Sequence, residues 1–139
     1  MISPSGNQLR FELLSRDGRN QQILDEAIGY WLYMADRTGT LWEHDDPQAS
    51  CNHGFASHAA HVLFRDVLGL YRVDHIGKSI QLRFADVKLD WCKGSIPTPD
   101  GPIDIQWRKA GDKFTYRLVA PPGYQVGIEN LTGKTLEKE

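Results

Sequence analysis

The sequence predicts an α+β protein, with helices in its first half and antiparallel strands in its second half. Between residues 20 and 37, apolar side chains recur at the spacing of one helix face. Beyond Gly77, apolar and polar side chains instead alternate in short runs, which is typical of half-buried strands. The change of period falls near residues 71–78, so we expect one domain over residues 1–76 and another over residues 77–139.

Helices account for most of the first domain. A short helix carries Leu9, Leu13 and Leu14, and the turn at residues 17–19 separates it from the next helix. That second helix covers residues 20–37, with Asn20 placed as an N-cap. Its predicted buried face consists of Leu24, Ala27, Ile28, Trp31, Leu32 and Ala35. A further helix is expected over residues 56–68, with Gly69 as the residue that ends it.

Short strands separated by turn residues make up the second domain. The alternating runs lie at residues 80–84, 87–91, 103–107 and 114–118, with a last strand at 124–129 and a frayed tail to Glu139. Turn signals stand at residues 97–101, 110–112 and 121–123. This pattern favours antiparallel hairpins or a β-sandwich.

Composition excludes several classes of protein. A chain of 139 residues with 40% hydrophobic and 24% charged residues is a globular chain. Its formal net charge of −2 gives no basic excess, so nucleic acid and anionic membranes are not expected partners. There is no run of the roughly 20 apolar residues that span a bilayer and no signal-peptide pattern, so we expect a cytoplasmic protein. Cys51 and Cys92 are expected to be two thiols, and no cofactor is expected.

Polar groups with catalytic potential gather in the loop at residues 38–54. Glu43 beside Trp42 is a candidate general base, because a loop carboxylate next to an aromatic side chain after a buried helix could be held ionised and oriented. Its ordinary alternative is a glutamate in a solvated salt bridge. Asp45 and Asp46 are further acids, although the sequence Asp-Asp-Pro favours a turn.

Other side chains of this region have two interpretations each. Trp42 and Phe55 present ring faces for a sugar, or they pack in the core. His58 and His61 lie three residues apart on a predicted helix, which is compatible with metal binding. The His-Glu-x-x-His signature is missing, so we predict no metal site.

Three motifs in order resemble the bacterial α-L-rhamnosidase family. The segment T-L-W-E-H-D-D, residues 40–46, is followed by N-H-G-F-A at residues 52–56. Gly18-Arg19 precedes the amphipathic helix, and W-C-K-G-S-I-P-T-P-D-G-P-I-D-I-Q-W at residues 91–107 resembles the family's C-terminal domain. The resemblance therefore extends over nearly the whole chain. One departure is Asp45, because the family often has an aromatic residue there, and this bears on the sugar preference.

The resemblance implies an inverting hydrolase of terminal α-L-rhamnosyl residues. Glu43 would be its general base, and Trp42, Asn52 and His53 would lie in the sugar pocket. The implied fold is a set of N-terminal helices from an incomplete (α/α)6 barrel, that of the six-hairpin glycosidases, followed by an antiparallel β-sandwich-like domain. In the family the general acid lies far upstream, so this chain is expected to be a fragment that lacks the general-acid region and is inactive alone.

Partners follow from the same resemblance. We expect a rhamnoside-type carbohydrate as ligand, and the missing barrel portion or self-association as cover for the helices. Two alternatives remain open. One is a glycosidase of the same barrel type acting on another sugar, and the other is a non-catalytic carbohydrate-binding or accessory module in which the β domain is the functional part.

Overall fold

The computed structural model describes residues 4–42, 48 and 57–139, and it divides into two compact units. The helical unit covers Met1–Leu63 and the β unit covers Phe64–Glu139. The predicted α+β class is confirmed. The units divide earlier than the expected boundary at residues 76 and 77, because the end of the last helix and an unexpected first strand belong to the β unit.

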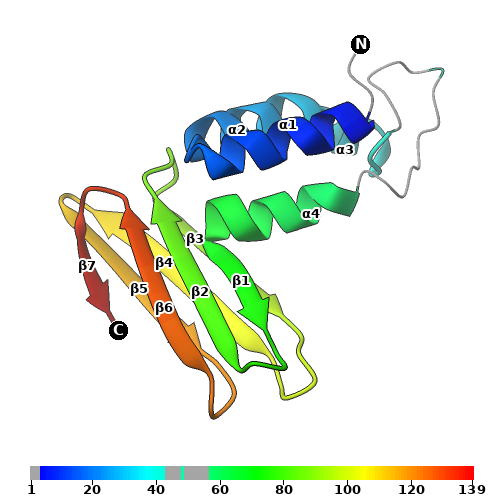
Figure 1. Cartoon of the computed structure of the whole chain (residues 1–139). Helices are drawn as coiled ribbons and strands as arrows, with labels where there is room; N and C mark the ends of the chain where they lie inside the picture. Colours follow the sequence, from blue (N-terminus) through cyan, green and yellow to red (C-terminus); the bar gives the residue numbers. More distant parts are fainter. Residues whose placement is uncertain (1–3, 43–47, 49–56) are drawn as a thin grey trace. The chain divides into compact units, whose positions relative to one another are not determined.

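The helical unit contains the predicted helices (Figure 1). Helix α1 covers Pro4–Arg16, and α2 (Asn20–Glu26), the π-helix η1 (Ala27–Leu32) and α3 (Tyr33–Thr38) follow one another without a break. Helix α4 covers His58–Val62. The prediction of Asn20 as an N-cap is wrong. Arg19 is the capping residue and makes no side-chain cap hydrogen bond, whereas Asn20 is buried inside the first turn.

The π-helical turn changes which side chains of the long helix are buried. Ile23, Leu24, Ala27, Trp31 and Met34 form the buried stripe. Ile28 and Leu32 belong to the predicted face but are 50% and 49% exposed. A π turn places more residues in each turn than an α-helix does, so a stripe extrapolated at 3.6 residues per turn drifts away from the buried side.

The core of the helical unit is aromatic at its centre. The rings of Phe11 and Trp31 lie 4.7 Å apart, centroid to centroid, and join α1 to η1. The buried cluster around them also contains Leu14, Ile23, Ala27, Ala59 and Val62. At its edge, the Arg10 guanidinium donates two hydrogen bonds, of 2.9 and 2.6 Å, to the carboxylate of Glu26. The same packing therefore ties α1, the long helix and α4 together.

The β unit consists of two sheets that face each other (Figure 1). The first has the order β1-β2-β6, with β1 at Leu70–Asp74, β2 at Ser79–Ala85 and β6 at Gln125–Leu131. The second has the order β3-β4-β5-β7, formed by Trp91–Ile96, Ile103–Ala110, Lys113–Val119 and Thr135–Lys138. Phe84 of the first sheet contacts Phe114 and Tyr116 of the second, at centroid distances of 4.9 and 5.2 Å. The predicted β-sandwich-like domain is confirmed.

Several details of the predicted strands are wrong. The sheets are mixed, because β6 pairs parallel with β2 and β7 pairs parallel with β5. Residues 87–90 connect two strands and do not form one, although Val87 is buried. The expected frayed tail contains β7, whose Thr135 pairs with Lys113. Parallel pairing joins segments far apart in the chain, and the local alternation of side chains carries no information about it.

The π-helix η3 (Leu63–Leu68) leads into the β unit. Gly69 follows it with φ +93°, in agreement with its predicted role as the terminating residue. The indole Nε1 of Trp107 donates a 3.0 Å hydrogen bond to the Leu68 carbonyl, which helix geometry leaves without an intrahelical partner. A Cβ at Gly94 would lie 2.7 Å from a Leu68 methyl group, so glycine allows the helix to pack closely on β3.

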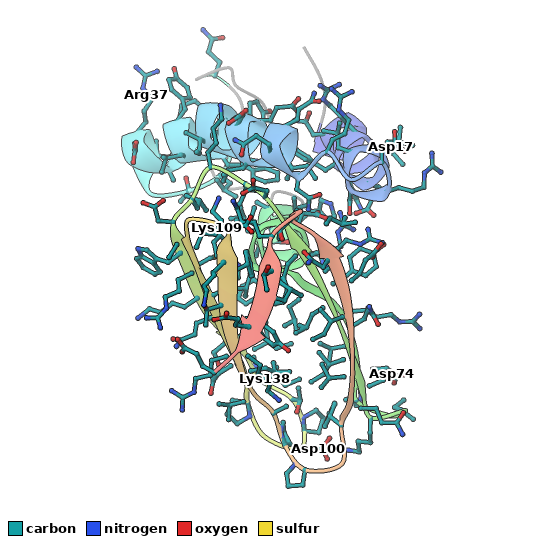
Figure 2. The ribbon with its side chains drawn as sticks, turned by 90° about the vertical axis from the view of Figure 1, so that its left-hand side faces the viewer. Asp17, Arg37, Asp74, Asp100, Lys109 and Lys138 are labelled. Atoms are coloured by element: carbon teal, nitrogen blue, oxygen red, sulfur yellow. The ribbon has the colours of Figure 1, made fainter. Side chains whose placement is uncertain are left out.

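Ion pairs hold the two ends of the sandwich. In Figure 2, Asp74 and Asp100 lie at one end and Lys109 at the other. Asp100 accepts hydrogen bonds from Lys78 and from the Tyr124 hydroxyl, and these donors lower the pKa of its carboxyl. Lys109 donates to Asp86 over 2.8 Å and lowers the pKa of that carboxyl. Within the described part of the chain, no helix has the length and apolarity needed to cross a membrane.

Candidate functional site

The predicted catalytic loop lies mostly outside the described residues. This applies to the candidate base Glu43 and to the sugar-pocket candidates Asn52 and His53. It also applies to His44, Asp45, Asp46 and Phe55. Trp42 is the predicted pocket residue whose position the structure describes. The roles assigned to Glu43, Asn52 and His53 therefore stay predictions.

Trp42 is held firmly against α3. Its side chain is 4% exposed, and its indole Nε1 donates a 2.7 Å hydrogen bond to the Thr38 hydroxyl. Its backbone N–H points to the Met34 sulfur at 3.4 Å, and its ring lies edge-on to Tyr33. These contacts favour the packing interpretation of Trp42, and its contact with a sugar stays a prediction.

The histidine pair on α4 joins the packing between helices. The imidazole of His58 lies 3.4 Å from the Glu12 carboxylate, and the rings of His58 and His61 are 5.4 Å apart. Among residues 4–42, 48 and 57–139, no three His, Cys, Asp or Glu side chains stand together as metal ligands would. Cys92 is a free thiol, and its burial raises its pKa, which disfavours the reactive thiolate.

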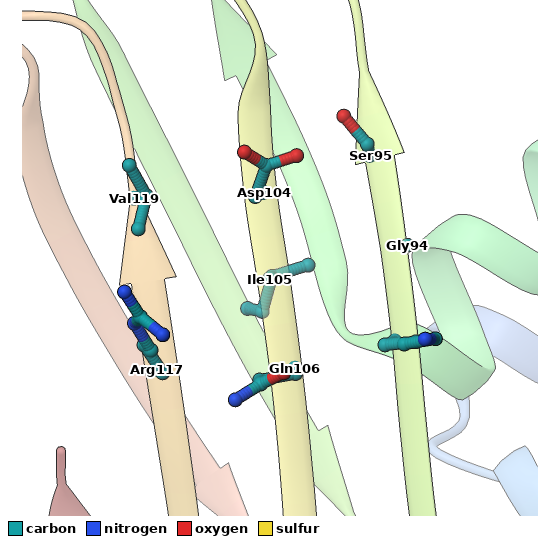
Figure 3. Close-up of a pocket in the computed structure, with 8 residues that line it drawn as sticks. Gly94, Ser95, Asp104, Ile105, Gln106, Arg117 and Val119 are labelled. Carbon is teal, nitrogen blue, oxygen red and sulfur yellow. The ribbon is translucent and has the colours of Figure 1, made fainter.

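A second candidate region lies on the outer face of the β3-β4-β5 sheet. A groove of about 450 Å³ runs over it, as Figure 3 shows. It is lined by Lys93, Gly94, Ser95, Asp104, Ile105, Gln106, Arg117 and Val119. A smaller hollow of about 180 Å³ adjoins it and shares Lys93 and Gln106. Sequence reasoning missed this region, although the alternation that buries Ile103, Ile105 and Trp107 already places Asp104 and Gln106 on the opposite face.

The β unit is similar in sequence to a domain of a known protein family. Residues 78–134 match the bacterial alpha-L-rhamnosidase C-terminal domain. The predicted rhamnosidase resemblance is confirmed. The match runs from the residue before β2 into the β6–β7 turn, so it contains all the residues that line the groove of the rhamnosidase-like β unit.

Longer relatives extend the likeness beyond the β unit. An alpha-L-rhamnosidase of Alteromonas sp. (strain LOR) is 26% identical over 133 residues, which cover 84% of this chain. The crystal structure of a GH78 family rhamnosidase of Bacillus sp. GL1 has the same fold over 98% of this chain, with a TM-score of 0.84 and 22% identity. The chain spans 14% of the Alteromonas protein and 16% of the Bacillus chain. Its fold and its β-unit sequence therefore resemble the C-terminal part of a rhamnosidase.

Proposed function

We propose that this chain is the C-terminal segment of an inverting glycoside hydrolase that removes terminal α-L-rhamnosyl residues. The order of its parts carries the proposal. A helical unit whose sequence carries the Trp42-Glu43 pair between α3 and α4 precedes a β unit that matches the rhamnosidase C-terminal domain. The relative from Alteromonas, named as an alpha-L-rhamnosidase, supports this substrate class.

Glu43 has the central chemical role in this proposal. As the general base, its carboxylate takes a proton from a water that attacks the anomeric carbon from the face opposite the leaving group. A general acid from another part of the enzyme protonates the leaving oxygen, and about 6.5–9.5 Å between the two carboxyls leaves room for the water. Trp42 is anchored by both its ring and its backbone, so the residue directly before Glu43 is held in place. Asn52 and His53 bind the sugar.

The exposed apolar side chains of the helices support a barrel around them. Leu9 and Leu13 on α1, and Ile28 and Leu32 on η1, are large apolar groups that the described residues leave exposed. In an (α/α)6 barrel, neighbouring helices would bury such faces. We therefore assign the helices of the expected 1–76 domain to the end of such a barrel and the β unit to the domain that follows it. The missing barrel portion, or a second copy of the chain, is the expected cover.

A chimeric enzyme tests the assignment of Glu43. In it, the matching 14% of the Alteromonas enzyme is replaced by this chain, and hydrolysis of an aryl α-L-rhamnoside is measured. We expect turnover, and a loss of about 10²–10⁴-fold for Glu43→Gln, which keeps the side-chain volume but removes the base. The matched control Asp46→Asn should stay within about tenfold of the parent.

Two outcomes would redirect the proposal. If the Glu43→Gln chimera kept its rate within about tenfold, Glu43 would not be the base. If the chimera turned over another aryl glycoside faster than the rhamnoside, the alternative of a different sugar would be favoured. That alternative rests on Asp45, which stands where the family often has an aromatic residue.

The chain alone provides a second test. We expect no measurable hydrolysis of the aryl rhamnoside, because leaving-group protonation contributes about 10²–10⁴-fold and the general acid is expected elsewhere. Robust turnover that disappears in Glu43→Gln would contradict the segment assignment while supporting Glu43 as the base.

A further inference from the structure

The outer face of the second sheet carries a regular set of polar side chains. Strand pairing aligns them in three rows across β3, β4 and β5. The rows are Trp91, Arg108 and Thr115; Lys93, Gln106 and Arg117; and Ser95, Asp104 and Val119. Neighbouring strands lie about 4.8 Å apart, and rows two residues apart along a strand are separated by about 6.7 Å. These three rows form an open surface, here called the platform, which lines the groove and the smaller hollow beside it.

Four side chains of this platform are not engaged by the protein. Across the residues that the structure describes, Lys93, Asp104, Gln106 and Arg117 make no side-chain hydrogen bond or ion pair. Several charges elsewhere in the β unit form ion pairs, namely Lys78–Asp100, Arg83–Glu129, Lys109–Asp86 and Lys113–Glu137. Figure 3 shows Asp104 and Gln106 on β4 and Arg117 on the adjacent strand β5. Their donors and acceptors are available to a ligand.

An exposed indole stands at the end of the same platform. Trp91 is 62% exposed, whereas Trp31, Trp42 and Trp107 are buried. Together with Lys93, Gln106 and Arg108, Trp91 lines the smaller hollow. A tryptophan in this position exposes apolar surface to water, which is unfavourable, and it adds nothing to the packing of the core. It offers a flat apolar face beside hydrogen-bonding groups, which is the combination that binding sites for small ligands use.

We propose that this platform binds an acidic oligosaccharide, one that contains uronic acid residues. Trp91 packs against the apolar face of a sugar ring. The Gln106 amide and the Asp104 carboxylate form hydrogen bonds with sugar hydroxyls. Lys93 and Arg117 flank Gln106 in one row and bind the sugar carboxylate through charge-assisted hydrogen bonds. The site would hold a polymeric substrate near the enzyme, and it goes beyond the proposed function because it involves neither Glu43 nor the barrel.

The same residues argue against other ligands. A nucleic acid needs many cations, whereas this platform combines two unpaired cations with the carboxylate of Asp104. A protein partner needs a desolvated apolar centre, whereas here Gln106 and the charges of Lys93 and Arg117 occupy the middle row. A simple inorganic anion has no apolar face that could pack against the indole of Trp91.

Calorimetric titration of the full chain with tetragalacturonate tests the proposal, in about 0.15 M salt to screen diffuse attraction. We expect saturable binding with a dissociation constant below about 1 mM, accompanied by a change in tryptophan fluorescence that is lost in Trp91→Ala. The double variant Lys93→Gln/Arg117→Gln should weaken binding at least about tenfold, as expected for hydrogen bonds to charged groups. Trp91→Ala should weaken it several-fold. The fully methyl-esterified tetrasaccharide, which lacks the carboxylates, should bind at least about tenfold more weakly.

Arg72→Gln provides the matched control. Arg72 is exposed on β1 of the other sheet, so the substitution removes one positive charge away from the platform. Its affinity for tetragalacturonate should equal that of the parent chain. All these surface variants should have the same Tm as the parent chain.

Three results would overturn the proposal. The first is no saturable binding by a folded chain up to about 10 mM, and the second is binding that Lys93→Gln/Arg117→Gln leaves unchanged. The third is equal affinity for the methyl ester, which would overturn the assignment of an acidic sugar. Because the readout is binding, its failure is separate from any failure of Glu43 as a base.

Discussion

The β unit and the helical unit bury their apolar side chains in different ways. In the β unit, Phe84 from one sheet and Phe114 from the other are at most 1% exposed and contact each other. The large apolar groups that it leaves exposed are Ile76 on a turn, Trp91 and Val119 on the platform, and Val126, Ile128 and Leu131 on the edge strand β6. Val126 and Ile128 pair with the buried Ile80 and Leu82 and so lie at the rim of the sandwich core. In the helical unit, Leu9 with Leu13 and Ile28 with Leu32 form exposed pairs at i and i+4, and Tyr33 and Leu63 are exposed as well.

This difference shows which part has a complete core. Single exposed apolar residues are normal on a protein surface, but i, i+4 pairs lie on one helix face and form a continuous apolar strip. Such strips mark contacts with other structure. We infer that the packing between its two sheets is enough to stabilise the β unit. The apolar strips of the helical unit, in contrast, should be covered by other helices or by a second chain.

Truncation inside the sandwich should have the largest effect on stability. Phe114→Ala removes a buried ring that contacts Phe84 and Trp107, and we expect a loss of about 3–5 kcal/mol in the free energy of unfolding. Ile28→Ala in the helical unit should cost less than about 1 kcal/mol, because Ile28 is half exposed. Urea denaturation measures both. Similar losses for the two variants would contradict the comparison.

The entry into the β unit should also be sensitive to a single added methyl group. Gly69→Ala would hold alanine at φ +93° and place its Cβ 2.9 Å from the Arg83 carbonyl oxygen. We expect a loss of about 1–3 kcal/mol. Gly111→Ala is the control, since Gly111 has φ +59° but no atom within 4 Å of the added Cβ. It should lose only about 1 kcal/mol, so equal effects would exclude the close contact as the cause.

Polar substitution of an exposed helix strip should change association with little effect on folding. We expect the parent chain to self-associate, and Ile28→Gln/Leu32→Gln to shift it toward the monomer, while the unfolding free energy changes by less than about 1 kcal/mol. Light scattering over a range of concentrations measures this. A parent chain that stays monomeric at high concentration would show that the strip needs no cover.

The smallest expected effect is the acid dependence of one ion pair. Lys109 lowers the pKa of Asp86 in the folded chain, so the pair stabilises the fold above the ordinary aspartate pKa near 4. This contribution is lost as the pH falls through the lowered pKa. It should be under about 1 kcal/mol, because the Asp86 side chain is 47% exposed. Below pH 4, the Tm of Asp86→Asn should change less with pH than the Tm of the parent chain does. An identical pH dependence of the two Tm values would contradict this role.

The local patterns of the sequence predicted the elements better than their pairing. Alternation located β2, β4 and β5, and Gly69 located the end of the last helix. The parallel partners β6 and β7 and the π-helical turns depend on contacts between distant residues and on packing. A count at 3.6 residues per turn therefore placed Ile28 and Leu32 on the wrong side of the helix.

The candidate sites divide in the same way. Trp42 and Glu43 were predicted as site residues because a resemblance gave meaning to a short motif, and their roles stay predictions. The platform was missed because the motif at residues 91–107 does not show which of its side chains share one face with Arg117. Lys93, Gln106 and Arg117 are separated in sequence, and only the register of three strands places them in one row. A sequence that shows alternation without register cannot indicate which outward side chains are neighbours.

Hydrogen exchange of the full chain, followed by mass spectrometry, tests most directly the claim that the β unit has its own complete core and the helical unit does not. We predict that amides of β2, β4 and β5 exchange slowest, and that those of η1, next to the exposed strip, exchange considerably faster. Equal protection of the helices and the strands in a monomeric chain would contradict the claim. The helical unit would then be a finished domain, and the barrel assignment would lose its physical support.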